Sequence, residues 1–246
     1  MDAVAVAAIL SAGAATAVGG LFLLVVPHPS DLVLSILLGF TAGVMLAATA
    51  FSLLVPALDL GSLGEVLAGF GLGALLFAAL DTAVPHVHAR FTERGHPRAA
   101  ERQRAMLLLS ALTLHNIPEG LAVGVAFAAG GADLGVPLAI AIGIQNVPEG
   151  FAAAAPLVGA GARTLVALGF AAATGLVEPP AAFAAFSAFE LASGLLPAGL
   201  AFAAGAMLYV VVDELVPESH ARGREREATL ALMGGFALMM GLDNAF

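Results

Sequence analysis

The chain has 246 residues, of which 60% are hydrophobic and 11% are charged. Soluble domains carry about 25% charged residues, so this composition excludes an ordinary soluble protein and indicates an integral membrane protein. The net charge of -9 at pH 7 does not identify a partner, because the placement of charges matters more than their sum in such a protein.

The first residues and the missing cysteines limit the interpretation further. The chain starts Met1-Asp2-Ala3-Val4, with an acid where a secretory signal would carry basic residues. We therefore expect the first apolar run to be retained as a transmembrane helix. Cysteine is absent, which excludes disulfides and thiolate ligands. Any bound metal must then be held by oxygen and imidazole nitrogen.

Apolar runs of about 20 residues recur along the whole length, with short polar breaks between them. They predict one all-α transmembrane domain, 1–246, with eight transmembrane helices and both termini on one side. The predicted helices cover residues 3–26, 31–56, 64–84, 104–129, 135–158, 163–189, 195–216 and 227–245.

Every basic residue is an arginine, and all of them fall in or beside the third, fifth and seventh connections between predicted helices. Positive residues near helix ends mark the cytoplasmic side, so the termini are predicted to face outward. We interpret these arginines as determinants of topology rather than as binding sites. They are Arg90, Arg94, Arg98, Arg102, Arg104, Arg163, Arg222, Arg224 and Arg226.

The second and seventh predicted helices share a motif. Residues 40–46 read FTAGVML and residues 202–208 read FAAGAML, and a proline follows each motif, at Pro56 and Pro217. The two helices run in opposite directions in the predicted topology. Oppositely oriented repeats that flank a central unit are typical of transporters, although coincidence in a chain rich in Ala, Gly and Leu is the alternative.

Two hexapeptides in the fourth and fifth predicted helices repeat one pattern around a proline: HNIPEG at 115–120 and QNVPEG at 145–150. An ionisable side chain at bilayer depth costs about 2.5 kcal/mol or more, so such clusters need compensation, which a cation can supply. In each hexapeptide a His or Gln lies four residues before the Glu, on the same helix face. Each pair is therefore predicted to hold one ion.

Further donors lie close to these pairs. Asn116 and Asn146 each lie three residues before a Glu and could serve an adjacent ion, with both Glu residues bridging the two ions. Glu178, in Glu178-Pro179-Pro180, falls near the centre of the sixth predicted helix. Carboxylates at one depth repel each other unless they are protonated or neutralised. The donor types suit divalent zinc, iron, manganese or cadmium better than copper(I).

These two hexapeptides, with Glu178-Pro179, resemble the ZIP (Zrt/Irt-like) family of metal-ion transporters and its bacterial GufA-like branch. The resemblance covers essentially the whole chain and implies eight helices in a 3+2+3 inverted-repeat arrangement with external termini. It implies that the transport site is formed by His115, Glu119, Gln145 and Glu149. It implies an adjoining site formed by Asn116, Glu119, Asn146, Glu149 and Glu178. Relatives often carry an acid or His at the position of Asn146, so the adjoining site has less negative charge here.

The resemblance also indicates a route on either side of the centre. Met45, Ala48 and Ser52 look like the outer gate and Asp59 like an entrance residue, with ordinary packing and a loop acid as the alternative. Asp213 and Glu214 resemble the inner exit site. The residues that could complete that exit or shuttle ions, or simply be solvated, are Asp81, His86 and His88.

We therefore predict a carrier in the plasma (inner) membrane that imports divalent transition-metal ions by alternating access, zinc first, and also iron, cadmium and manganese. The resemblance implies an elevator-like slide of the first, fourth, fifth and sixth helices against the others. The expected partners are the metal-ion substrate and the lipid bilayer, with no cofactor, no nucleic acid and no enzymatic activity.

Three alternatives stay open at this point. One is a channel-like metal facilitator. Another is an intramembrane metal-dependent hydrolase, although the chain has no His-Glu-x-x-His sequence. The third concerns assembly: small-residue surfaces such as 69–73 permit a homodimer but also serve internal packing.

Overall fold

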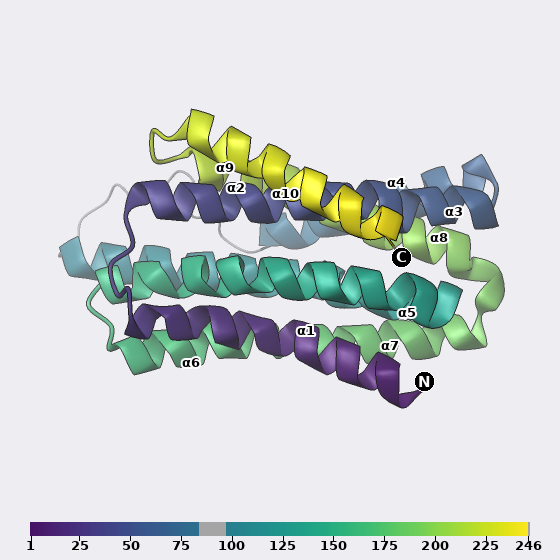
Figure 1. Cartoon of the computed structure of the whole chain (residues 1–246), viewed down its shortest axis with the longest axis horizontal. Coiled ribbons are helices and arrows are strands. Elements are labelled where there is room, and N and C mark those ends of the chain that lie inside the picture. The colour runs from purple at the N-terminus through teal and green to yellow at the C-terminus, as the bar shows by residue number, and fades with distance from the viewer. Residues whose placement is uncertain (84–96, 246) are drawn as a thin grey trace.

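The computed structural model describes residues 1–83 and 97–245, and gives the backbone alone for residue 83 and residues 97–112. In this part of the chain every regular element is a helix, and Figure 1 shows long rods lying side by side. The elements are α1 (Ala3–Leu21), η1 (Phe22–Leu24), α2 (Asp31–Ala47), η2 (Ala48–Leu54), α3 (Val55–Leu60), α4 (Leu63–Ala83), α5 (Pro97–Gly159), α6 (Thr164–Gly175), α7 (Glu178–Leu191), η3 (Ser193–Leu195), α8 (Leu196–Val210), η4 (Val211–Leu215), α9 (Val216–His220) and α10 (Glu225–Ala245).

Short polar residues begin three of these helices. The Asp2 carboxylate caps α1, and the Ser30 hydroxyl caps α2, each by accepting a bond from a backbone N–H three residues later. Before α4, Ser62 and Glu65 form a capping box: Ser62 N–H donates to Glu65 Oε2 at 2.8 Å, and Glu65 N–H donates to Ser62 Oγ at 3.3 Å. Helix starts are thus set by local sequence.

Seven helical segments within the described residues are long and apolar enough to cross a membrane. Large apolar side chains point outward from them, such as Leu75 at 70% exposure and Leu191 at 91%. Such exposure is unfavourable in water, whereas acyl chains cover it in a bilayer. The predicted class, an all-α integral membrane protein, is confirmed.

One of these segments, Thr113–Gly159, has 47 residues, whereas a single crossing needs about 20. It lies in α5, which breaks at Gly131, where φ is 58° and ψ is -138°, a conformation that glycine tolerates. A straight helix would set Glu119 and Gln145 about 39 Å apart, yet the Gln145 amide nitrogen lies 2.6 Å from a Glu119 oxygen. The halves of α5, 97–130 and 132–159, are therefore antiparallel neighbours. They fit the fourth and fifth predicted helices, and the total of eight stays a prediction.

Four predicted helices are not continuous α-helices, and the first of them ends in the short 3₁₀ segment η1. The sixth is divided between α6 and α7, so Glu178 begins α7 rather than continuing one helix, but it still lies midway along the 164–191 membrane segment, as predicted. Pro179 and Pro180 follow at once, and they cannot continue α6 because proline lacks an N–H. The second and seventh predicted helices each contain a π-helical segment, η2 and η4, shortly before Pro56 and Pro217.

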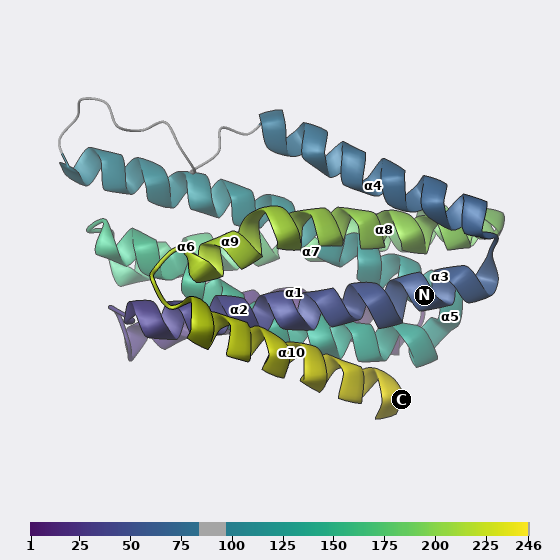
Figure 2. The same cartoon turned by 90° about the horizontal axis from the view of Figure 1, so that it is seen from above.

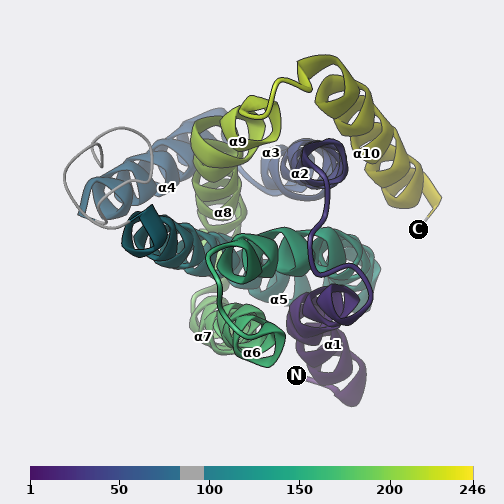
Figure 3. The same cartoon turned by 90° about the vertical axis from the view of Figure 1, so that its left-hand side faces the viewer.

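The helices form two groups, which Figure 3 shows end-on. The motif group consists of α5, which carries both hexapeptides, and of α1, α6 and α7, which pack against it. The flanking group consists of α2, α3, α4, α8, α9 and α10 with η2 and η4. The two groups meet where α5 contacts α2 and α8.

The shared motif occupies equivalent places in the flanking group. A Cβ added to Gly43 would lie 1.9 Å from the Leu232 carbonyl oxygen on α10, and one added to Gly205 would lie 2.0 Å from the Phe70 carbonyl oxygen on α4. Glycine permits this close approach. Thus α2 pairs with α10 and α8 pairs with α4, as Figure 2 shows. This exchange of partners fits two inverted halves.

The arginines of the described connections lie toward one end of the long axis of the molecule. Both marked chain ends lie toward one end of the molecule in Figure 1, and the α5–α6 and α9–α10 connections lie at the other. Those connections carry Arg163, Arg222 and Arg224. The acids Asp59 and Glu190 lie on α3 and α7, near the connections at the end where the termini lie.

Candidate metal centre

Side chains from three helical segments converge inside the motif group. Each predicted central ligand is at most 2% exposed. The first half of α5 contributes three of them, the second half contributes three, and α7 contributes one. In that order they are His115, Asn116, Glu119, Gln145, Asn146, Glu149 and Glu178.

The glycine that ends each hexapeptide lets the neighbouring helices approach. A Cβ on Gly120 would lie 2.3 Å from the Glu178 carbonyl oxygen, and one on Gly150 would lie 2.0 Å from the Thr16 carbonyl oxygen. Any side chain at these positions would therefore push α7 and α1 away from α5. The hexapeptides thus supply both polar donors and the contact that brings them together.

Hydrogen bonds connect part of this cluster. Gln145 Nε2 donates to Glu119 Oε1 at 2.6 Å and to Asn146 Oδ1 at 2.7 Å. Asn146 Nδ2 lies 2.8 and 3.0 Å from the two Glu178 carboxylate oxygens and 2.9 Å from the Ala12 carbonyl oxygen. The network therefore links both halves of α5 to α7 and α1.

Five of the seven central residues hold all the buried side-chain polar atoms without a hydrogen-bond partner in the described part of the chain, apart from Ser35 Oγ. An unsatisfied buried polar group costs about 1–3 kcal/mol, so their gathering at one place calls for a ligand. Carboxylate and amide oxygens with imidazole nitrogen are donors that divalent transition metals accept. The unpartnered atoms include His115 Nδ1, Asn116 Oδ1 and Nδ2, Glu119 Oε2, Gln145 Oε1 and Glu149 Oε2.

A second acidic cluster adjoins the centre, where α4 meets η4. One ligand atom each from Asp81, Asp213 and Glu214 lie within 4.8 Å of one another. Glu214 Oε2 is also 2.9 Å from His115 Nε2, so the two clusters are in contact. The structure thus brings together three of the predicted exit residues, while His86 and His88 lie outside the described residues.

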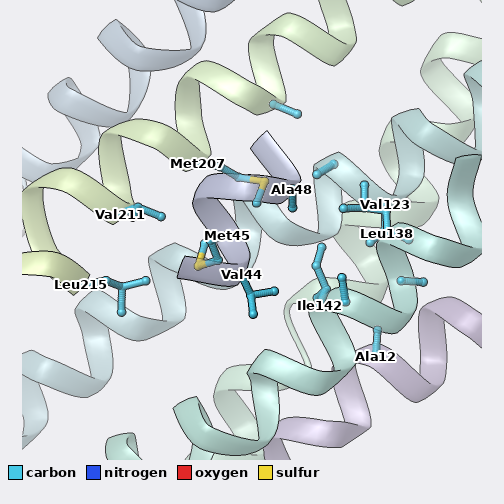
Figure 4. Close-up of a cluster of buried hydrophobic side chains, with 14 of the residues drawn as sticks. Ala12, Val44, Met45, Ala48, Val123, Leu138, Ile142, Met207, Val211 and Leu215 are labelled. Atoms are coloured by element: carbon cyan, nitrogen blue, oxygen red, sulfur yellow. The ribbon is translucent and has the colours of Figure 1, made fainter. Parts of the chain in front are cut away.

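The predicted gate residues lie where the two groups meet. Met45 and Ala48 are fully buried in an apolar layer that Figure 4 shows beside Met207, with Ile142 of α5 nearby. The other predicted gate residue, Ser52, donates from its hydroxyl to Asp243 Oδ1 at 2.8 Å and so ties η2 to α10.

Asp59, the predicted entrance residue, is exposed near the end of α3. The roles of Asp59 and of the gate residues stay predictions.

Several polar residues at these sites were missed by the sequence analysis. The Tyr209 hydroxyl donates to Asp81 Oδ2 at 3.0 Å, and the Thr16 hydroxyl lies 3.4 Å from Glu178 Oε1. Tyr209 gave a signal, since it is the single tyrosine of the chain and directly follows the second copy of the shared motif. Thr16 and Asp243 gave none, because one hydroxyl or acid in an apolar helix does not reveal its neighbour.

Fold and centre together define a multi-pass helical membrane protein with a buried, ligand-rich polar interior. Residues 91–243 match the family described as ZIP Zinc transporter. The chain is 45% identical over 244 residues to "Zinc transporter ZIPB" of Bordetella bronchiseptica, covering 94% of this chain and 78% of that protein. It is 44% identical over 243 residues to "Zinc transporter GufA" of Myxococcus xanthus, covering 95% of each.

A third relative, "Zinc transporter ZupT" of Escherichia fergusonii, is 36% identical over 138 residues, covering 53% of this chain and 52% of that protein. The chain therefore belongs to the ZIP zinc transporter family, as the two hexapeptides predicted.

Proposed function

We propose that this protein is a carrier that moves divalent transition-metal ions, zinc first, across the cell membrane into the cytoplasm. The observation that carries the proposal is the set of buried oxygen and nitrogen atoms without hydrogen-bond partners on both halves of α5, all of types that bind metal ions. Buried polar atoms without partners are costly, whereas a divalent ion would satisfy several of them at once. The zinc named for the three relatives supports zinc as the substrate.

The proposed route passes from the centre to the acidic cluster. His115 is a predicted ligand of the transported ion, and its imidazole is 2.9 Å from Glu214, a member of that cluster. An ion that leaves His115 therefore meets a carboxylate directly. The cluster lies on the flanking group, so release would hand the ion from one group of helices to the other.

The proposed motion is a slide of the motif group against the flanking group. The layer between them is apolar and includes Met45, Met207 and Ile142. An apolar layer can shift without breaking many directional bonds, and methionine adapts its shape easily. The slide would break the polar contacts between the groups, which include the His115–Glu214 pair and the bond from the Thr41 hydroxyl to the Gln145 carbonyl oxygen. This division of the helices is the one expected for alternating access in inverted repeats.

The test is zinc uptake by purified protein in liposomes, with the internal pH recorded at the same time. His115→Ala and Glu149→Ala each remove a predicted ligand, so we expect uptake to fall about 10- to 100-fold, by analogy with the loss of groups that support metal sites. Glu190→Ala is the matched control, because Glu190 is an exposed acid on α7 outside both clusters. Unchanged uptake in both centre variants would refute the proposal.

A concentration series separates carrier from channel. A carrier that binds one ion in each cycle saturates as zinc rises, whereas a channel-like facilitator keeps gaining flux over the same range. Repeating the series with cadmium, ferrous iron and manganese gives the substrate range, which ligand type alone does not fix because divalent affinities follow a shared order.

A further inference from the structure

The central residues divide into two sets by their hydrogen bonding. Five of them, His115, Asn116, Glu119, Gln145 and Glu149, have buried polar atoms without partners. Asn146 and Glu178 do not. Both amide atoms of Asn146 are hydrogen-bonded, and both carboxylate oxygens of Glu178 accept bonds.

The position of the Asn146 amide nitrogen resembles that of a bound cation. It lies 2.8 and 3.0 Å from the two oxygens of one carboxylate, nearly midway between them, and 2.9 Å from the Ala12 carbonyl oxygen. This atom must be the nitrogen of the amide rather than its oxygen, because a backbone carbonyl accepts hydrogen bonds and never donates them. Three oxygens thus surround an N–H donor.

We propose that Asn146 replaces a second metal ion in this chain. Its amide group occupies the bidentate position on Glu178, so the centre takes a single divalent ion, bound among His115, Glu119, Gln145 and Glu149. This inference rests on the proposed function. Asn146 is then a positioning residue: it sets the number of ions through Glu178 and does not bind the transported ion.

Charge supports a single ion. Glu119 and Glu149 are the carboxylates of the centre that keep an unpartnered oxygen, and their two negative charges balance one doubly positive ion. A second ion beside Glu178 would need oxygen donors where the structure has N–H groups pointing at the carboxylate. Replacing that amide by a carboxylate would remove the donor and free the Glu178 and Ala12 oxygens.

The same bonds have a mechanical consequence. Through Asn146, the second half of α5 is tied to α7 at Glu178 and to α1 at Ala12, with no ion required. A metal bridge would loosen each time its ion left, whereas the amide bridge persists. The motif group is therefore held together both with and without the transported ion.

Counting bound zinc in purified protein tests the inference. Each protein is measured with and without the additional change Glu149→Ala, and the difference in zinc content gives the number of ions at the centre. Zinc bound at the acidic cluster is present in both measurements and cancels in this difference. We expect one central ion for the wild type and two for Asn146→Asp. Two ions in the wild type, or one in Asn146→Asp, would overturn the inference.

Two further variants separate the amide bridge from charge alone. Gln145→Glu makes the same amide-to-acid change one residue earlier and leaves Asn146 in place, so it should still bind one central ion. The double variant Asn146→Asp with Glu178→Gln should return from two ions to one, because the freed carboxylate is gone. A second ion in Gln145→Glu would show that added charge is sufficient, and would overturn the role of Asn146.

Crystals of the wild type grown with cadmium give a readout that needs no variant. We expect one anomalous peak among the donors of the two halves of α5 and none bound to Glu178. A peak bound to Glu178 would overturn the inference but leave the proposed function intact. A wild type that neither binds zinc at the centre nor transports it would overturn the proposed function, and this inference with it.

Discussion

Tyr209 binds one of the carboxylates of the acidic cluster formed by Asp81, Asp213 and Glu214. Its hydroxyl donates to Asp81 Oδ2 at 3.0 Å, and a ligand atom of this carboxylate lies within 4.8 Å of those of Asp213 and Glu214. Three carboxylates within reach of one another repel unless a donor or a cation lies between them. A tyrosine hydroxyl supplies such a donor without adding positive charge that would compete with a passing ion.

Tyr209→Phe should therefore slow zinc uptake without abolishing it. The variant keeps the ring and removes one hydrogen bond worth about 1 kcal/mol, which corresponds to about a fivefold change in rate. Initial uptake rates in liposomes measure the effect. Thr82→Val is the control, because the Thr82 hydroxyl is exposed and bonds only within its own helix in the described contacts; equal rates for both variants would contradict the assigned role.

The unpartnered donors of the centre predict a stabilising effect of zinc. An ion that binds only the folded state raises the free energy of unfolding by about 2.7 kcal/mol when its free concentration is 100 times the dissociation constant. The melting temperature should therefore rise when zinc is added to metal-free protein. Glu149→Ala should show a smaller rise, since it removes a carboxylate with an unpartnered buried oxygen. Equal rises in both proteins would place the stabilising ion elsewhere.

At the scale of elements, the flanking group is held together by pairs of helices in close contact. On α10, Gly235 packs so closely against α2 that a Cβ would lie 2.2 Å from the Phe40 carbonyl oxygen. The neighbouring Gly234 has nothing within 4 Å of such a Cβ. An added methyl group would therefore clash with α2 at Gly235 but would have open space at the adjacent Gly234.

Gly235→Ala should destabilise the protein, and Gly234→Ala should not. Overpacking of this kind costs about 1–3 kcal/mol, which corresponds to a fall of about 2–12 °C in melting temperature for a chain of this size. Alanine favours helix over glycine by about 1 kcal/mol, so the Gly234 variant should melt at the same temperature or higher. Thermal melts of the two variants in one detergent make the comparison; a similar fall in both would rule out the close α2–α10 contact as the cause.

Hydropathy and motif spacing predicted the helical membrane class, because burial in lipid requires long apolar runs whatever their neighbours. Spacing within the hexapeptides also predicted which polar residues gather at the centre, since residues four apart share a helix face. The π segments η2 and η4 and the break before Glu178 were not predicted. Proline indicates that a helix is interrupted nearby, but packing against other helices decides whether the helix bulges or ends there.

The sequence did not predict which side chains from distant elements contact each other. The bond between Ser52 and Asp243 and the pair formed by His115 and Glu214 join residues far apart in the chain. A lone acid in an apolar helix indicates that it needs a partner and does not say which one. The role of Asn146 was partly indicated by its type, whereas the three oxygens around its nitrogen came only from the fold.

At the scale of the whole molecule, the motif group carries the centre, and the flanking group carries the acidic cluster and the apolar layer around Met45. The contact between His115 and Glu214 joins the two polar clusters across the division. The arginine-bearing connections lie at the end of the molecule opposite the termini, so the orientation in the membrane fixes which way the acidic cluster faces.

Orientation can be tested directly because the chain has no cysteine of its own. Ser193→Cys places one thiol at an exposed position in the α7–α8 connection, toward the end where the termini lie. Ala221→Cys places one at an exposed position in the α9–α10 connection, beside Arg222. Positive residues are retained on the cytoplasmic side. In intact cells a membrane-impermeant maleimide should therefore label Ser193→Cys and should label Ala221→Cys only after the membrane is permeabilised.

The reverse labelling pattern would mean that the protein has the opposite orientation in the membrane, with the acidic cluster facing outward. Labelling of both variants in intact cells would contradict the placement of these two connections at opposite ends of the molecule.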